Sequence, residues 1–564
     1  MQDEETRGGI DRRGFLRAGA AGSAALIVRP ARAGAAPHGD REMPEQRGAA
    51  TPGSDASFDL DEVTIDDLQH RMQSGQETAR SLVEKYTARI NAMDTSGTLP
   101  LRSVLEINPE ALAIADALDA ERKSKGPRSP LHGIPILLKD NVATADRMQT
   151  TAGSLALLGV KPPKDSFVAA RLRAAGAVLL GKTNLSEWAN FRSTHSSSGW
   201  TGRGGQCRNP YALDRSPSGS SSGSGAATAA NFCAGAIGTE TDGSITSPSN
   251  NNGLVGIKPT VGLVSRAGVI PISHSQDTAG PMTRTVRDAA LVLGALTGVD
   301  PDDAYTKDSA GKSHRDYTPF LDPNGLKGAR IGIPRKGLFG YSPITDRLAD
   351  AAIADLERLG AVIIDPADIP TLDDLGDGEN TVLQTEFKSD MQAYLTWLGA
   401  GTHPRTLEDL IAFNEAHKKE EMPYFGQEIF IQSAARGPLT DPAYVKALAR
   451  NHQLTRAQGI DAVMDKYRLD ALVAPTGGPA WLVDLVDGDY GTGGCTTFPA
   501  VAGYPHITVP AGFAWGLPVG LSFFGRAWSE PVLLKLAYAY EQGTKHRQPP
   551  KFLRTADLDV RETD

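Results

Sequence analysis

The stretch from Ser216 to Pro259 reads SPSGSSSGSGAATAANFCAGAIGTETDGSITSPSNNNGLVGIKP, and these 44 residues decide how the rest of the sequence is interpreted. They are almost all Gly, Ala, Ser, Thr and Asn, so neighbouring backbones can approach closely. Apolar residues recur from Ala226 to Ile257, which argues against a flexible linker. A phosphate-binding loop would need Gly-Lys-Ser/Thr, which this stretch does not contain. The stretch therefore predicts a packed helix between two tight turns, one with Ser220, Ser221 and Ser222 and the other with Ser244.

The composition is that of a globular protein and excludes several classes of function. The chain has 564 residues, of which 40% are hydrophobic and 22% charged. Its net charge is −9 without a dense Lys/Arg stripe, which argues against nucleic-acid binding. No apolar run of about 18 residues occurs, so stable membrane insertion is not expected. Three widely spaced cysteines (Cys207, Cys233 and Cys495) match no zinc or disulfide pattern and are predicted to be buried free thiols.

The N-terminus has the pattern of a targeting segment. Arg12 and Arg13 precede a weakly apolar, Ala/Gly-rich region, and Ala31-Arg32-Ala33 suits a signal peptidase. Residues 1–33 thus resemble a twin-arginine signal, although Asp11 stands where Ser or Thr is usual. The alternative is a disordered basic tail. The signal implies transfer of the folded protein by the twin-arginine export machinery to the periplasm or the exterior, and residues 34–56 are predicted to be a disordered linker.

Residues 57–550 are predicted to form one domain in which helices and strands alternate, followed by a C-terminal tail at 551–564. Such alternation is typical of an α/β fold with an interior sheet. Residues 277–281 read as a turn, and residues 376–460 as helices that cover the sheet or cap a cleft. Helices are predicted near 64–72, 78–91, 111–122, 166–175, 285–296, 345–359 and 530–544, and strands near 134–138, 177–180, 330–334, 361–364, 471–474, 507–510 and 520–524.

Serine nucleophiles need a base, and the sequence offers histidine or lysine. His132, His195, His274 and His506 have no acidic partner evident in the sequence, and the hydrolase elbow GxSxG does not occur. Lys139 directly follows the apolar run Ile134–Leu138. Its side chain either reaches the surface or is buried with a lowered pKa, and the polar pair Asp140-Asn141 favours a buried site.

Three motifs together resemble the amidase signature family. They are GIPILLKDN at 133–141, SPSGSSSG at 216–223 and GTETDGSI at 238–245, and GIKPT at 256–260 extends the match. The resemblance covers about residues 60 to 550. It implies a single large α/β domain with a central mixed β-sheet covered by helices on both faces. It also implies a catalytic triad of Lys139, Ser220 and Ser244, with a cis peptide bond before Ser220.

In this family the lysine is neutral and accepts the serine proton through the second serine. Carried over, Ser244 attacks a carboxamide, Ser220 relays the proton to Lys139, and the backbone N–H groups of Thr241, Asp242 and Gly243, with that of Ser244, stabilise the oxyanion. An acyl-enzyme then reacts with water. The resemblance implies neither a metal nor an organic cofactor.

The nucleophile motif departs from the common family pattern GTDTGGSIR at three positions. Glu240 replaces Asp, Asp242 replaces Gly and Thr246 replaces Arg. This variant, together with Gly199-Trp200, the run 203–206 and the run 529–531, resembles the peptide amidase branch. That branch implies C-terminal amides of peptides as substrates.

The expected function is release of ammonia from a carboxamide. A glutaminase-type subunit of a tRNA amidotransferase shares the signature, but the export signal argues against it. A non-catalytic binding protein on the same fold is disfavoured because all three triad residues are present. Four aromatic residues either line a substrate pocket or pack inside the protein: Trp200, Trp481, Tyr490 and Phe498. Three acids either repel substrate carboxylates or belong to a solvated loop: Asp484, Asp487 and Asp489.

Overall fold

A computed structural model describes residues 58–97 and 99–558. The predicted twin-arginine signal and linker therefore lie outside the described residues. Contacts divide the chain into Met1–Asp61 and Glu62–Asp564, and the fold described here is that of the second unit. Within the described residues, no helix has the length and apolar character needed to cross a membrane.

The second unit is built on one mixed sheet of 11 strands, as the α/β interpretation predicts. Its strand order is β1-β3-β2-β4-β6-β5-β10-β11-β9-β7-β8. The strands are β1 (Val104–Ile107), β2 (Pro135–Lys139), β3 (Val178–Thr183), β4 (Gly235–Glu240), β5 (Val255–Lys258), β6 (Thr278–Thr283), β7 (Arg330–Gly332), β8 (Val362–Ile364), β9 (Ala471–Pro475), β10 (His506–Ala514) and β11 (Leu517–Phe524).

Two parallel neighbours, β2 and β4, form the part of the sheet that matters for the site. Ile136 pairs with Gly235 and Leu138 with Ile237, and every residue of both strands is buried. Burial on both faces explains the nearly continuous apolar run that predicted β2. Because the two strands are parallel and in register, Lys139 and Glu240 emerge at the same edge of the sheet.

The predicted turn at 277–281 is wrong, because most of it is the buried strand β6. This strand lies antiparallel between β4 and β5. Its turn-like composition has a packing reason: a Cβ on Gly280 would lie 2.0 Å from the carbonyl oxygen of Ile257. The Ser216–Pro259 stretch likewise contains two strands, β4 and β5, and a second helix, where only one helix was predicted.

Most predicted helices are present, and several begin at a hydroxyl cap. Thr64 and Thr78 each accept a hydrogen bond from the backbone N–H three residues later, which satisfies a free donor of the first turn. The α-helices named in the text and figures include α2 (Ile65–Ser74), α3 (Ala79–Met93), α4 (Ala111–Lys125), α5 (Phe167–Ala175), α6 (Ser222–Ala229), α7 (Thr246–Asn251), α8 (Val286–Leu296), α9 (Pro343–Arg358), α15 (Asp461–Tyr467), α16 (Thr497–Ala502) and α17 (Glu530–Thr544).

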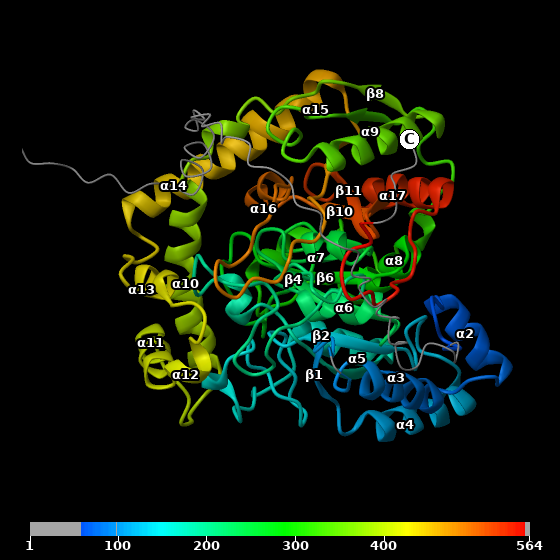
Figure 1. The fold of residues 1–564 in the computed structure, drawn as a ribbon, viewed down its shortest axis with the longest axis vertical. Helices are drawn as coiled ribbons and strands as arrows, with labels where there is room; N and C mark the ends of the chain where they lie inside the picture. The colour runs from blue at the N-terminus through cyan, green and yellow to red at the C-terminus, as the bar shows by residue number, and fades with distance from the viewer. Residues whose placement is uncertain (1–57, 98, 559–564) are drawn as a thin grey trace, which may run out of the picture. The chain divides into compact units, whose positions relative to one another are not determined.

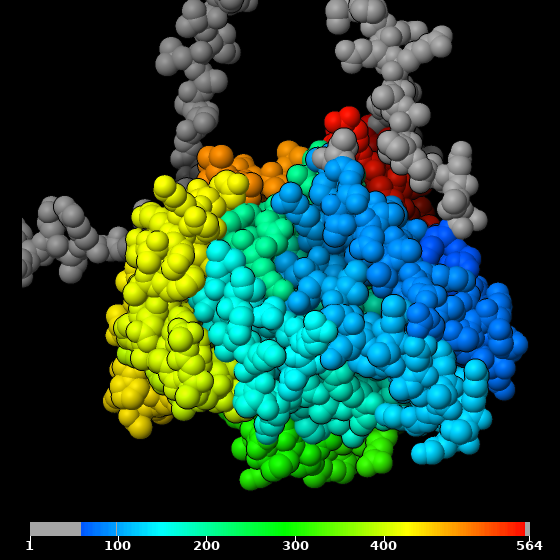
Figure 2. All heavy atoms as spheres, turned by 90° about the horizontal axis from the view of Figure 1, so that it is seen from below, coloured from blue at the N-terminus to red at the C-terminus, as the bar shows by residue number. Residues whose placement is uncertain are grey.

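The predicted helical region 376–460 forms its own layer. It comprises α10 (Gly378–Trp397), α11 (Leu407–Ala416), α12 (Lys418–Glu421), α13 (Glu428–Ala434) and α14 (Pro442–Thr455), which stand along one side of the sheet in Figure 1. Figure 2 shows α11–α13, in yellow, beside the blue and cyan segments of the N-terminal half. Phe387 of α10 and Phe430 of α13 pack in one apolar core with Trp188, so this layer is joined to the body.

The folded body continues past the predicted boundary at residue 550. The backbone N–H of Phe552 donates to Pro210 and that of Leu213 donates to Leu553. Ala556 is buried in a cluster with Tyr211 and other apolar residues. The three cysteines are free and buried, as predicted.

Candidate active site

Lys139 ends strand β2 and is completely buried. Its Nζ donates to Ser220 Oγ at 2.7 Å and to Thr239 Oγ1 at 2.9 Å. Burial lowers the pKa of Lys139 to about 7, while the carboxylates of Asp277 and Glu240 oppose that change. Near neutral pH a large fraction of the amine is therefore unprotonated, as a base must be.

Ser220 and Ser244 lie on two turns that contact each other. Ser220 shortly precedes α6, and its peptide bond with Gly219 is cis, as the resemblance implies. The backbone N–H of Ser221 donates to the carbonyl of Ser244 at 3.1 Å and so joins the two turns. Lys139 and Ser220 have no exposed surface, whereas Ser244 is 8% exposed, so the proposed nucleophile is the member of the group that solvent reaches.

Gly219 is required by the packing around this turn. A Cβ at that position would lie 2.1 Å from Ser186 Oγ and 2.9 Å from Ser198 Oγ. No side chain fits at such distances. The backbone at Gly219 is thereby held close to the serines that surround the site.

The backbone from Thr241 to Ser244 forms the turn after β4. Among the described residues, no hydrogen bond outside the strand ladder is donated by the N–H groups of these four residues. Gly243 has φ of +77°, a conformation that glycine adopts without strain. Free N–H groups beside a serine are what an oxyanion site needs.

The side chain of Asp242 is held by hydroxyl groups. Its carboxylate accepts from Thr496 Oγ1 at 2.6 Å and from Thr497 Oγ1 at 2.9 Å. Burial raises the pKa of Asp242, and these two hydrogen bonds oppose the rise. The acid that departs from the common motif is thus tied to the start of α16, which leaves its backbone N–H available to the turn.

The other two departures, Glu240 and Thr246, are partners. Glu240 Oε2 accepts from the N–H groups of Ile245 and Thr246 at 2.8 and 2.9 Å, and from Thr246 Oγ1 at 3.1 Å. Burial raises the pKa of Glu240, and the buried ammonium of Lys258 opposes that rise. This cap fixes the two residues that follow Ser244.

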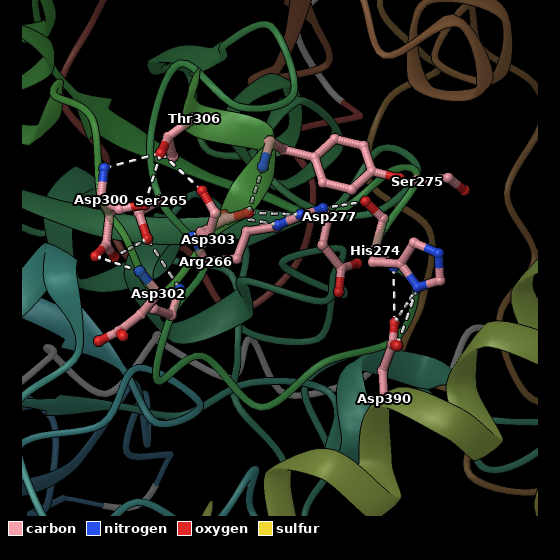
Figure 3. A network of polar contacts seen from close by, with 12 residues as sticks. Ser265, Arg266, His274, Ser275, Asp277, Asp300, Asp302, Asp303, Thr306 and Asp390 are labelled. Carbon is pink, nitrogen blue, oxygen red and sulfur yellow. Dashed lines mark hydrogen bonds and ion pairs between the residues drawn. The ribbon is translucent and has the colours of Figure 1, made fainter. Parts of the chain in front are cut away.

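One histidine has acidic partners that the sequence did not reveal. His274 Nδ1 lies 2.9 Å from Asp390 (Figure 3). Its Nε2 lies 3.4 Å from Glu386, and both acids belong to α10. Burial lowers the pKa of His274, but the two carboxylates outweigh it and the net shift is upward. The three side chains are close enough to hold a metal ion. An imidazole with a carboxylate at each nitrogen is instead suited to carry both protons and to join α10 to this loop.

The proposed substrate residues have mostly structural contacts. Trp200 packs edge-on against Tyr424 and Phe425, and Phe498 is buried in a separate apolar core. Tyr490 is 78% exposed. Trp481 Nε1 donates to a carboxylate of the same loop.

The acidic loop is ordered by its own side chains. Asp484 accepts from the backbone N–H groups of Val486 and Asp487, which makes it a turn residue. Asp489 accepts from the backbone and hydroxyl of Ser198, and from Trp481. Since Ser198 lies against Gly219, Asp489 is the acid of this loop that is linked to the site.

Comparison with known proteins agrees with this geometry. Residues 81–534 match the model of the family described as Amidase. A solved structure of the native peptide amidase of Stenotrophomonas maltophilia is 51% identical, with a TM-score of 0.84 over 88% of this chain and 99% of that one.

Sequences of other proteins also match this chain over most of its length. A probable amidase of Arabidopsis thaliana is 42% identical over 507 residues, covering 88% of this chain and 93% of that one. A glutamyl-tRNA(Gln) amidotransferase subunit of Moorella thermoacetica is 36% identical, covering 86% and 97%. The chain therefore belongs to the amidase family and is an enzyme that hydrolyses amide C–N bonds. Within that family its motifs and its fold match the peptide amidase branch.

Proposed function

We propose that this amidase hydrolyses the C-terminal carboxamides of peptides, with Ser244 as nucleophile, Ser220 as proton relay and Lys139 as base. The observation that carries the substrate is the 51% identity to a peptide amidase across 99% of that chain. The triad is supported by the buried contact of Lys139 with Ser220 and by the backbone hydrogen bond from Ser221 to Ser244 that joins the two serine turns.

The proposed mechanism gives each group a step. Neutral Lys139 takes the proton of Ser220, which takes that of Ser244, whose Oγ attacks the amide carbonyl. The N–H groups of the turn from Thr241 to Gly243 stabilise the oxyanion; one such donor is worth about 3–4 kcal/mol in other hydrolases. The proton then returns through Ser220 to the leaving nitrogen, ammonia departs, and water repeats the sequence on the acyl-enzyme.

We also propose that the protein is exported by the twin-arginine route to the periplasm or the exterior. Arg12 and Arg13, the Ala/Gly-rich region and Ala31-Arg32-Ala33 support this proposal. Replacing both arginines by lysine should retain the protein in the cytoplasm with its amidase activity intact, as measured by fractionation. Export of that variant at the normal level would contradict the route.

A substrate panel tests the peptide assignment. Peptide amides, aryl amides, aliphatic amides and free glutamine are compared by ammonia release, with Ser244→Ala as the blank. We expect the highest kcat/KM on peptide amides. Activity on glutamine alone would instead favour the glutaminase function of the amidotransferase subunits.

A further inference from the structure

A small inner cavity adjoins Thr239, whose hydroxyl oxygen accepts a hydrogen bond from Lys139. Its volume of about 10 Å³ is enough for one water molecule. Its polar lining comes from β4, from the loop after β2 and from the start of β6. The polar residues around it that matter here are Asn141, Thr239, Thr241, Asp277 and Thr278.

Two polar atoms of this lining are buried without a partner among the described residues. They are Asn141 Oδ1 and Thr278 Oγ1, on side chains that are 3% and 2% exposed. A buried polar group left unpaired costs about 1–3 kcal/mol, so such atoms mark a place that a small polar ligand would stabilise. A single water molecule can bond to both.

The hydroxyl of Thr239 supplies a third partner. Its oxygen accepts from Lys139 Nζ and from Asn141 Nδ2, each at 2.9 Å, which occupies both lone pairs. The one hydrogen of Thr239 Oγ1 is therefore left to donate. A water in the cavity would then accept from Thr239 and Thr278 and donate to Asn141 Oδ1 and to the carboxylate of Asp277, which also lines the cavity; four hydrogen bonds lie within the range of a buried water.

Asp277 connects this cavity to solvent. Its Oδ1 accepts from Thr241 Oγ1 at 2.6 Å, and its Oδ2 accepts from the backbone of Ile272 and Ser273. It lines both the inner cavity and an outer pocket of about 610 Å³ that opens to solvent. In Figure 3, Asp277 lies between Arg266 and His274, at the wall of that pocket.

We propose that the inner cavity binds one water molecule that links Lys139 to Asp277, and that Asp277 is a positioning residue which controls the protonation of Lys139. This inference rests on the amidase chemistry of the proposed function, but not on peptides being the substrate.

A proton can pass along this link in three transfers, each of which conserves atoms and charge. Lys139 ammonium gives a proton to Thr239 Oγ1, whose own hydrogen passes to the water, and the water passes one to the Asp277 carboxylate. Lys139 is then neutral and Asp277 is protonated, and Asp277 releases its proton to the outer pocket. The pKa of Asp277 is raised to about 6 by burial, close to that of Lys139, so transfer in either direction is feasible.

The other charged groups around these two residues are already paired. Arg266 binds the carboxylate of Asp303, and His274 lies between Asp390 and Glu386. Glu240, the other acid that raises the pKa of Lys139, is held by the backbone after Ser244. Asp277 is thus the acid that faces the cavity.

The acidic limb of kcat/KM against pH tests the inference, because it reports the pKa of the base in the free enzyme. Asp277→Asn keeps the size of the side chain, and its amide can donate to the rotated hydroxyl of Thr241. We expect the limb to move to lower pH by about 0.5–1 unit, since a nearby negative charge no longer favours the ammonium form. Asp300→Asn, an acid of the outer pocket only, should leave the limb in place. An unchanged limb in Asp277→Asn would overturn the proposal.

A second variant tests the water. Thr278→Val keeps the shape of the side chain, removes a water partner and leaves the charge of Asp277 in place. A high-resolution crystal structure should show the water in the wild type and not in Thr278→Val, and an empty wild-type cavity would reject the water link. This readout needs no activity, so it separates failure of the inference from failure of the proposed function.

Discussion

Replacing Lys139 by methionine should lower the catalytic rate by orders of magnitude and at the same time stabilise the folded protein. Methionine is unbranched and apolar, with a length similar to that of lysine. Removing a general base typically costs about 10²–10⁴ in rate. The same change removes an amine that burial makes costly to protonate, so stability and activity should move in opposite directions.

The size of the stability gain follows from the pKa. The pKa of Lys139 falls from 10.5 to about 7 on folding, and each unit is worth about 1.36 kcal/mol, so the cost is about 4–5 kcal/mol. The unfolded chain binds the proton more tightly, so this cost is fully present below about pH 7, shrinks as pH rises and vanishes above about 10.5. The lost hydrogen bonds to Ser220 and Thr239 offset about 0.5–1.5 kcal/mol each, leaving a net gain of about 1–4 kcal/mol at pH 7.

Urea unfolding of the wild type and of Lys139→Met from pH 6 to 9.5 measures this difference. We expect the variant to be the more stable at pH 6 and 7, and the gap to close toward pH 9.5. A gap that is absent at pH 6, or that does not depend on pH, would refute a buried lysine with a lowered pKa. Residual activity near that of the wild type would refute its role as base.

Three further outcomes are expected. Ser220→Ala should lower kcat by about 10²–10⁴ with little change in KM, whereas Ser224→Ala in the neighbouring helix should lose less than tenfold in steady-state assays. Glu240→Ala leaves two backbone N–H groups without an acceptor, so it should lower the free energy of unfolding by about 2–5 kcal/mol in urea and also lower kcat. Glu240→Gln keeps an acceptor oxygen and should lose less stability. Equal losses of stability in the two variants would argue against the cap. Leu137→Ala, in fully buried β2, should cost about 2–5 kcal/mol, and a cost below about 1 kcal/mol would contradict the tight packing around Lys139.

Local motifs were enough to predict much of the fold and the candidate site residues. Lys139, Ser220 and Ser244 sit in short segments whose residue types are set by their immediate surroundings. The strand before Lys139 was predicted because burial on both faces leaves only apolar side chains. Capped helices were predicted because their signals lie within one turn.

Contacts between distant segments could not be predicted in the same way. Strand β6 was mistaken for a turn because Gly280 serves close packing against β5, which no local pattern reveals. The partners of His274 lie more than 100 residues along the chain, so its carboxylates were missed. The pairing of Glu240 with Thr246 needed the path of the backbone after Ser244.

By itself, the sequence determined the α/β class, the family and which residues are candidates for the chemistry. The tertiary structure decided how deeply those residues are buried and how the pKa of Lys139 is shifted. Lys139 has a lowered pKa because strands from three separate parts of the chain (β2, β3 and β4) enclose it, and only Ser244 keeps a route to solvent. Burial is a property of the packed sheet, because it arises only when strands that are distant in the sequence pack around a residue.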